Sequence, residues 1–561
     1  MNASYQKNMY GSRKAFALVM VLVVAIVLTL LGVGLLQVCY GVRLRSMKLK
    51  RETIAMLAAE AGYEKGIFWM SQQDDVLTGL YNSEPGSVGS ISFAGGKCDY
   101  EVQFYNFIGS RPIFRILSTG TSGLASRVVD VYVMQKITGW DMGKCRIPTG
   151  TSSTGEVNFA NGEIINIPIH INNLKDSPDN RDIYIIGSPQ FLEKVEMGES
   201  QNNGLIDKYS GFMGLFDGGI LFDQPDVRIT DEDVVQSKID RFTNSTDPSY
   251  IFEPEGTANL PNPQSAVQLE FFVESAIGYV RITNNCTVRG ANPGIYDYRI
   301  VSGTDGTQYE KYNIYAYHYK PDDPSNIITV PIEDTYVKQT FPGSGAVSDP
   351  GGQIFINGNV VIGSADYDEM VVKGKLTVVA TGTIWIADTI KVSEPLHGGT
   401  FVPIKNNESV LGLISQRVIK VIDPGLSDDF GTLDPVEDII VGNANMHSYV
   451  PVANGANTTT NVRYLPDPTI VIAAITVGGG GWGAENVGNR KEFDGSQDDL
   501  LVIGSISEAV RGVVGIVGTD GFIKKYTIDE RLLEGVLPGN IWFGGKYIPA
   551  PAGWHDYRTD N

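Results

Sequence analysis

Residues Phe16 to Tyr40 read FALVMVLVVAIVLTLLGVGLLQVCY, and this stretch decides how the chain is organised. It contains no Asp, Glu, Lys, Arg or His. A helix needs about 20 predominantly apolar residues to cross the hydrocarbon core of a bilayer. In lipid the backbone must also satisfy its own hydrogen bonds, which a helix does. The stretch therefore predicts a membrane-spanning helix, with Phe16, Met20, Leu36 and Tyr40 in the span.

Basic residues border the span on both sides. Arg13 and Lys14 precede it, and a basic collar follows it, consisting of Arg43, Arg45, Lys48, Lys50 and Arg51. Residues 1–51 hold 8 Lys and Arg and no acid, which leaves 36 basic and 64 acidic residues in the remainder, a net charge of −28. So acidic a body would be repelled by phosphates. We therefore expect a solvated body outside the membrane and no nucleic-acid partner.

The helix is expected to continue beyond the span. No Pro interrupts residues 42–71, so one helix from Phe16 to about Met70 would be roughly 80 Å long at 1.5 Å per residue. Its distal half should pack against a head through the apolar residues that recur there at helical spacing, namely Ile54, Leu57, Ala61 and Phe68. A plain single-span anchor is an alternative. A cleaved secretory signal is another, although its apolar core is normally about 7–15 residues long.

The junction before the span resembles a known processing signal. Residues 14–21 read KAFALVMV, similar to the class III signal of type IV pilins and type II secretion pseudopilins. There, a basic leader and a small residue precede the cut, and Phe or Met opens the apolar helix. The resemblance implies that prepilin peptidase cuts between Ala15 and Phe16. The family usually has Gly before the cut, and major pilins have Glu at the fifth mature position, where this chain has Met20.

The lack of that Glu is familiar in PilX-type and GspK-type minor subunits. Residues 58–62 (AAEAG) also resemble the A-x-E-A-G piece of the PilX N-terminal region. The resemblance covers about residues 11–72. It implies a bacterial inner-membrane protein whose helix joins other pilin or pseudopilin subunits and an assembly platform. The body would lie in the periplasm, or at the cell surface after filament assembly.

The rest of the chain is expected to be mainly β. A leader (1–15) and the helix (16–72) precede a small antiparallel pilin-like sheet (73–140). The turn pattern STGT, residues 118–121, resembles the sheet of minor pilin heads. An unrelated β module is the alternative. A β-rich region with polar insertions (141–345), a β-helix-like domain (346–535) and a tail (536–561) follow.

Short apolar runs with Gly or Asn corners favour a right-handed parallel β-helix-like body. Asn357 and Asn359 would stack inside it, and the glycine run 477–483 would form a flexible loop. A β-sandwich is the competing fold, because periodicity alone does not separate the two. Residues 500–507, Arg511-Gly512 and 521–532 resemble the end of an uncharacterised bacterial domain that commonly follows a PilX-like N-terminus.

No pattern in the sequence predicts a catalytic, cofactor-binding or metal-binding site. Asp366, Asp368 and Glu369 would be the acids of a polysaccharide-active enzyme, but paired carboxylates must be held at a defined separation, and neighbours in a loop do not guarantee it. A Ca²⁺ site there, or at residues 176–182, is another possibility. So is binding of surface glycans without turnover.

Four cysteines are present, of which Cys39 lies at the end of the span. Three others allow one disulfide and one free thiol. We expect Cys98 to pair with Cys145, because both belong to the membrane-proximal region. Together, these observations predict a minor pilin-like structural subunit that is not an enzyme.

Overall fold

The fold was obtained as a computed structural model that describes residues 4–558 with gaps. The gaps are 74–75, 78–79, 81–87, 94, 109–110, 137–138, 145–156, 173–182, 199–209, 226–231, 258–262, 291–296, 303–307, 313–315, 322–326, 338, 341–346, 349, 364–369, 423–448, 454–458, 464–467, 486–497, 517–519, 534–538 and 540–545.

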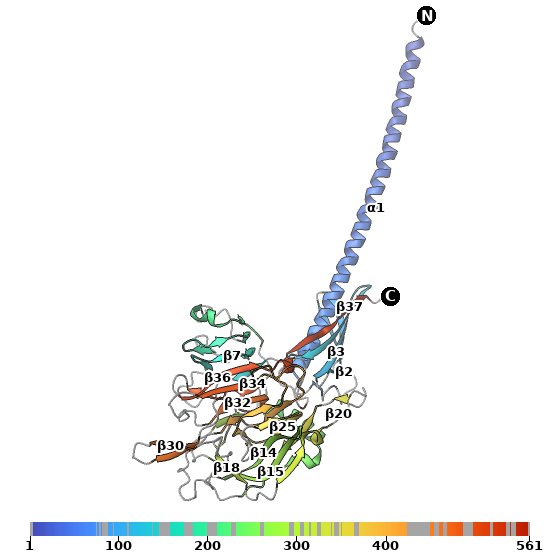
Figure 1. The fold of residues 1–561 in the computed structure, drawn as a ribbon. Helices are drawn as coiled ribbons and strands as arrows, with labels where there is room; N and C mark the ends of the chain where they lie inside the picture. The colour runs from blue at the N-terminus through green and yellow to red at the C-terminus, as the bar shows by residue number, and fades with distance from the viewer. Residues whose placement is uncertain are drawn as a thin grey trace.

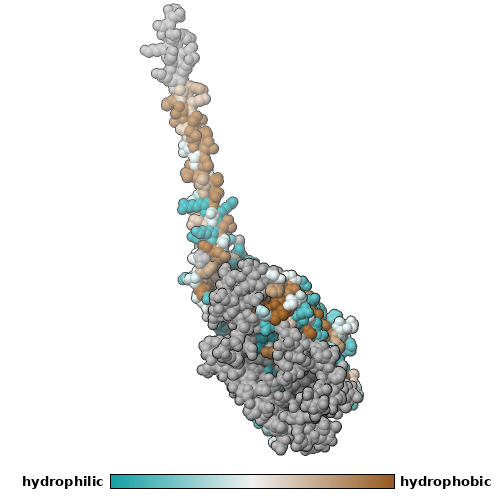
Figure 2. All heavy atoms as spheres, turned by 90° about the vertical axis from the view of Figure 1, so that its left-hand side faces the viewer, coloured by the Kyte–Doolittle hydropathy of each residue, from teal (hydrophilic) through white to brown (hydrophobic). Residues whose placement is uncertain are grey.

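A single helix, α1 (Ser4–Ser71), runs from near the N-terminus into the β-rich remainder of the molecule, which we call the head (Figure 1). Its apolar part stands clear of the rest of the molecule, as the brown shaft of Figure 2 shows. The helix is long and apolar enough to cross a membrane, by length and composition, and none of its most apolar window is buried. The prediction of one long N-terminal helix is confirmed.

Five antiparallel strands form a sheet that packs on the distal part of α1. The strands are β1 (Val88–Phe93), β2 (Gly96–Ile108), β3 (Arg111–Ser122), β4 (Ala125–Gln135) and β37 (Tyr547–Arg558), in that order across the sheet. The first four come from the region predicted to form it. The fifth comes from residues 536–561, which the sequence analysis treated as a tail. The last strand of the chain therefore pairs with the strands that directly follow α1.

The helix and sheet touch through small residues. Ala55, Ala58 and Ala59 are fully buried. A Cβ added to Gly120 on β3 would lie 2.0 Å from the Ala55 carbonyl oxygen, so the two backbones are in direct contact. The predicted buried face was wrong: Leu57 and Phe68 are 41% and 56% exposed, and Ile54 and Ala61 are only half-buried. The contact face combines the small residues, where the backbones approach most closely, with the buried Tyr63 and Met70 further along the helix.

Beyond the sheet, the body is built from ladders of parallel strands. One ladder runs β22 (Gly352–Ile356), β25 (Lys375–Ala380), β28 (Val410–Ser415), β32 (Thr469–Val477) and β34 (Asp498–Val510). A second runs β14 (Pro263–Glu274), β23 (Asn359–Ile362), β26 (Ile384–Ile386), β29 (Ile419–Val421) and β33 (Trp482–Ala484). A third edge carries β24 (Met370–Val372) and β27 (Ile390–Val392), again parallel. Successive passes of the chain thus add parallel strands to the same ladders; whether the body is a β-helix stays a prediction.

The order of the strands in space differs from their order in the chain. After the sheet, β5 (Trp140–Lys144) pairs with β34, and β8 (Ile169–Ile171), β11 (Val195–Met197) and β12 (Ile220–Leu221) extend the ladder outward. The chain then passes through α4 (Glu232–Ser245) to β13 (Ile251–Phe252), which pairs with β22 at the opposite end. From there it returns coil by coil to β34. The first and last coils therefore meet in the middle.

Smaller elements complete the fold. Strands β7 (Ile164–Asn166) and β36 (Asp520–Ile528) pair beside β34, and β15 (Ile277–Gly290) forms a hairpin with β14. The others are β6 (Val157–Phe159), β9 (Ile183–Ile185), β10 (Gln190–Phe191), η2 (Ser210–Leu215), η3 (Pro248–Tyr250), β16 (Asp297–Ser302), β17 (Gln308–Tyr312), β18 (Ala316–Pro321), β19 (Ile327–Pro331), η4 (Ile332–Thr335), β20 (Gln339–Thr340), β21 (Val347–Ser348), β30 (Tyr449–Ala453), β31 (Thr459–Arg463), β35 (Gly515–Ile516) and α6 (Glu530–Leu533).

Two predictions about the corners of the body were wrong. Asn357 is exposed and Asn359 half-buried. Asn359 bonds outside the core, accepting from the Thr383 amide (3.0 Å) and donating to the Ser265 carbonyl (3.1 Å). The glycine run is not a flexible loop, because residues 477–481 are buried. A Cβ on Gly481 would lie 2.2 Å from the Val510 carbonyl oxygen. These glycines allow two backbone segments to touch.

Candidate assembly site

The apolar half of α1 exposes a large hydrophobic surface that lipid or another protein must cover. Phe16, Met20, Leu36 and Tyr40 are 67%, 58%, 71% and 65% exposed, and the most apolar window has a mean hydropathy of 3.1. The Thr29 hydroxyl donates to the Ala25 carbonyl (2.7 Å) within the helix. Such a surface is stable only against lipid or other apolar helices, because exposing it to water is unfavourable.

The expected cleavage point lies within this helix. Ala15 and Phe16 are consecutive residues of α1, and Phe16 is exposed on the shaft. Met20 lies one turn further along, also exposed. Neither the cleavage nor the significance of Met20 is tested by the geometry, so both remain predictions.

The five-stranded sheet also packs closely against α1 around Gly62. Gly62 faces Ser118 and Cys98, where an added Cβ would lie 2.2 Å from the Ser118 hydroxyl oxygen and 2.9 Å from the Cys98 sulfur. Cys98 is buried, and this burial raises the pKa of its thiol. Cys145 lies outside the described residues, so the predicted Cys98–Cys145 disulfide is not shown and stays a prediction.

A buried charge cluster joins the sheet to the body. His170 on β8 and Glu196 on β11 are neighbours in register. The Lys546 ammonium, just before β37, donates to Glu196 (2.8 Å) and contacts His170 Nδ1 (3.0 Å). Lys136, just after β4, donates to the other Glu196 oxygen (3.3 Å). His170 and Lys546 hold the pKa of Glu196 far below its ordinary value.

A second buried cluster closes the seam between the first and last coils. The Glu508 carboxylate on β34 accepts from the Trp140 indole (2.9 Å) and from the backbone amides of Trp482 (2.9 Å) and Gly512 (3.1 Å). The Arg511 guanidinium lies over the Trp140 ring, 4.9 Å from its centre. Burial raises the pKa of Glu508, and Arg511 opposes this. Every group here has a structural partner, so the cluster holds the coil closed.

A third cluster fastens the last coil to an earlier loop. Arg531 is 2% exposed and donates from Nη1 to the carbonyls of Asn407 (2.6 Å) and Ser409 (2.8 Å). Its Nη2 donates to Asp529 (2.6 Å). Asp529 and Arg531 belong to the segment that resembled the end of an uncharacterised domain. Their arrangement gives that pattern a structural role.

None of the candidate chemical residues is brought into a site by the described parts of the chain. Asp366, Asp368, Glu369 and residues 176–182 lie outside them, so the enzyme and Ca²⁺ alternatives remain untested predictions. Among the described residues, no group of His, Cys, Asp and Glu could hold a metal ion. No sequence pattern singles out Glu196, Lys546 or Glu508, because their partners lie up to 376 residues away in the chain.

Comparisons with known proteins leave the family of this chain unassigned. No family model and no curated protein matches this chain. Among solved structures, the competence-associated pilin ComZ from Thermus thermophilus is similar over 91% of this chain and 98% of that chain, at 10% sequence identity and a TM-score of 0.29. A similarity of this degree does not place the chain in a family.

Proposed function

We propose that this chain is a minor pilin-like or pseudopilin-like subunit that is anchored in the bacterial inner membrane by α1 and joins a filament through the same helix. The observation that carries the proposal is one continuous helix, α1 (Ser4–Ser71), with two different halves. The first half is apolar and exposed all round, and the second is fastened to a β-rich head.

The division of the helix supports a structural role. A plain anchor needs about 20 apolar residues and no rigid connection to the domain it carries. Here the small-residue face of α1 is in backbone contact with β3, and the Lys546–Glu196 pair fixes the sheet to the body. The helix, the sheet and the body should therefore move together when force is applied to the helix. The body would be presented outward for assembly or adhesion, with surface glycans among its possible ligands.

Processing of the N-terminus tests this proposal. In a bacterium with prepilin peptidase, the mature protein is expected to begin at Phe16 by mass spectrometry. An Ala15→Leu variant should remain uncut, because the signal needs a small residue before the cut. An Ala17→Leu variant, two residues away, should be cut normally. An intact Met1, or a mature start beyond about residue 40, would refute the proposal.

A further inference from the structure

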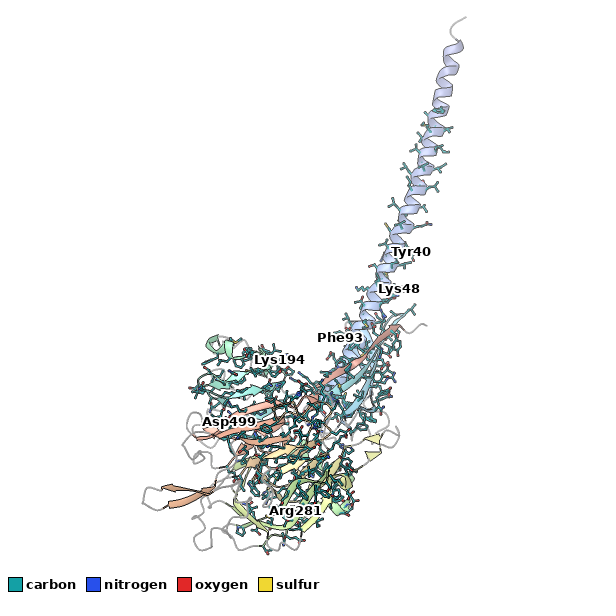
Figure 3. All side chains as sticks on the ribbon, viewed as in Figure 1. Tyr40, Lys48, Phe93, Lys194, Arg281 and Asp499 are labelled. Atoms are coloured by element: carbon teal, nitrogen blue, oxygen red, sulfur yellow. The ribbon has the colours of Figure 1, made fainter. Side chains whose placement is uncertain are left out.

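One end of the five-stranded sheet carries exposed apolar side chains beside the basic collar. The β1–β2 and β3–β4 turns both lie at this end, next to the part of α1 that follows the span (Figure 3). A Cβ built on Gly123, in the β3–β4 turn, would be 3.4 Å from Nε of Arg51. Arg51, the last residue of the collar, therefore adjoins the β3–β4 turn, at the end of the head nearest the span.

The apolar residues of these turns are unusually exposed. Leu124, at the tip of the β3–β4 turn, is 90% exposed, and Phe93, at the end of β1, is 48% exposed. Lys97, at the start of β2, is exposed between them in the sheet order. Large apolar side chains at two adjacent turn tips contribute nothing to the core. They fit a surface that contacts an apolar or interfacial medium.

The charge of this surface selects the partner. The collar supplies Arg43, Arg45, Lys48, Lys50 and Arg51, and the first acid after them is Glu52. Basic residues next to a span attract anionic lipid headgroups. The remainder of the chain is strongly acidic, so an anionic membrane would attract this end of the head and repel the others. Apolar tips flanked by basic side chains are the pattern of an interfacial membrane contact.

The length of the span brings the surface within reach of the headgroups. The 25 residues from Phe16 to Tyr40 measure about 37 Å along a helix, longer than a hydrocarbon core of about 30 Å. Excess length is accommodated mainly by tilt. Arg51 lies 11 residues beyond Tyr40, or about 17 Å. A tilt lowers this height and swings one side of the head toward the bilayer.

From this geometry we infer that the collar, Phe93, Lys97 and Leu124 form a docking surface for anionic phospholipid headgroups. The inference rests on the membrane anchoring proposed above. Before assembly, the head rests on the membrane through this surface, with Leu124 and Phe93 in the interface. Transfer of the subunit from the membrane into a filament would then require this contact to break.

The test uses the full chain, one copy per lipid nanodisc, with a spin label at Leu124→Cys in a Cys39→Ser/Cys145→Ser background that leaves only the buried Cys98 and Cys286. Accessibility to oxygen and to a water-soluble nickel reagent reports lipid contact. In nanodiscs with 30% phosphatidylglycerol the label should be lipid-exposed; in pure phosphatidylcholine it should face water. Each Lys or Arg near an anionic surface contributes about a fivefold factor. Replacing Lys48, Lys50 and Arg51 by Gln should lower the docked-to-free ratio roughly 100-fold.

Two control labels separate the possible outcomes. A Tyr105→Cys label, on an exposed residue of β2 away from the turns, should face water in both lipids. A Val27→Cys label should be lipid-embedded in both. If Val27 is embedded and Leu124 faces water in both lipids, the docking surface is refuted while the anchor stands. If Val27 is not embedded, the anchor fails. Protection of Leu124 that needs a second copy in the disc would identify another subunit as the partner and also overturn the inference.

Discussion

Substitution of Gly120 by Ala tests the backbone contact between helix and sheet. The new Cβ would lie 2.0 Å from the Ala55 carbonyl oxygen, 2.4 Å from the Ala59 amide nitrogen and 3.0 Å from the Ala59 Cβ. Two of these atoms are backbone, so no rotamer change relieves the overlap. Overpacking of this kind costs about 1–3 kcal/mol. At about 2 kcal/mol, the helix would separate from the sheet roughly 30 times more often.

The buried thiol of Cys98 reports this separation, because it lies beside Gly62 on the same contact. Full-length protein in detergent is first reduced, so that Cys98 is a thiol, and is then treated with a maleimide, and labelling is followed peptide by peptide. Cys39 is exposed and should react at once. Cys98 should react about 30-fold faster in Gly120→Ala than in the parent chain when reclosing outpaces labelling. Cys286, buried in the body, should be unaffected.

The matched control is Gly214→Ala, where an added Cβ meets nothing within 4 Å. It should leave Cys98 labelling unchanged. If Gly120→Ala also left the Cys98 rate and the thermal stability unchanged, the backbone contact would not be the element that holds the head to the helix.

Three further predictions concern the buried clusters. Arg531→Met removes the guanidinium donors to Asp529 and to the carbonyls of Asn407 and Ser409, and leaves Asp529 only the backbone amide of residue 531 among these donors. It should lower the free energy of unfolding by about 3–5 kcal/mol, measured by urea denaturation; a smaller loss in the Arg531→Met/Asp529→Asn double variant would show that the loss is coupled to Asp529. Glu508→Gln keeps one acceptor oxygen for the Trp482 and Gly512 amides and places its NH₂ against the Trp140 indole N–H. It should destabilise the seam by about 3 kcal/mol, seen as faster hydrogen exchange of β5 and β34; unchanged exchange would contradict this. The pKa of Glu196 is lowered by His170 and Lys546, so its stabilisation is present above about pH 4.5 and is lost as the pH falls further; Glu196→Gln should flatten the acid limb of the thermal stability profile, whereas Glu64→Gln, on the exposed side of α1, should not.

The long helix could be predicted because its signal is local. Residues 16–40 are predominantly apolar and carry no charged side chain, and residues 42–71 contain no Pro, so each turn follows from its neighbours. The buried face of the distal half was not predictable in the same way. Helical periodicity favoured Leu57 and Phe68, but the face in contact is decided by how closely β3 approaches. That distance is set by Gly120, in a segment far along the chain.

The parallel ladders could be predicted from short apolar runs with Gly corners, but their order could not. Ile354, Val378 and Leu413 are all buried and occupy matching positions on β22, β25 and β28, so consecutive coils follow the chain. The β5–β34 contact joins Trp140 to Ile506, and no periodicity links positions so far apart. The charged residues that secure these junctions could not be predicted from the sequence for the same reason, because the partners of Glu196 and Lys546 lie in other segments of the chain.

The last strand shows most clearly how context overrides local sequence. β37 reads YIPAPAGWHDYR, and two Pro and a Gly argue against a strand. It is nevertheless accommodated, because β37 is an edge strand that pairs only with β4, and the register shifts between Pro549 and Trp554. Proline is tolerated where no ladder partner needs its missing N–H. Residues near the end of the chain thus supply both the strand that covers the free edge of β4 and the Lys546 side chain that contacts Glu196. The sheet that packs on α1 is therefore completed by residues from the opposite end of the chain.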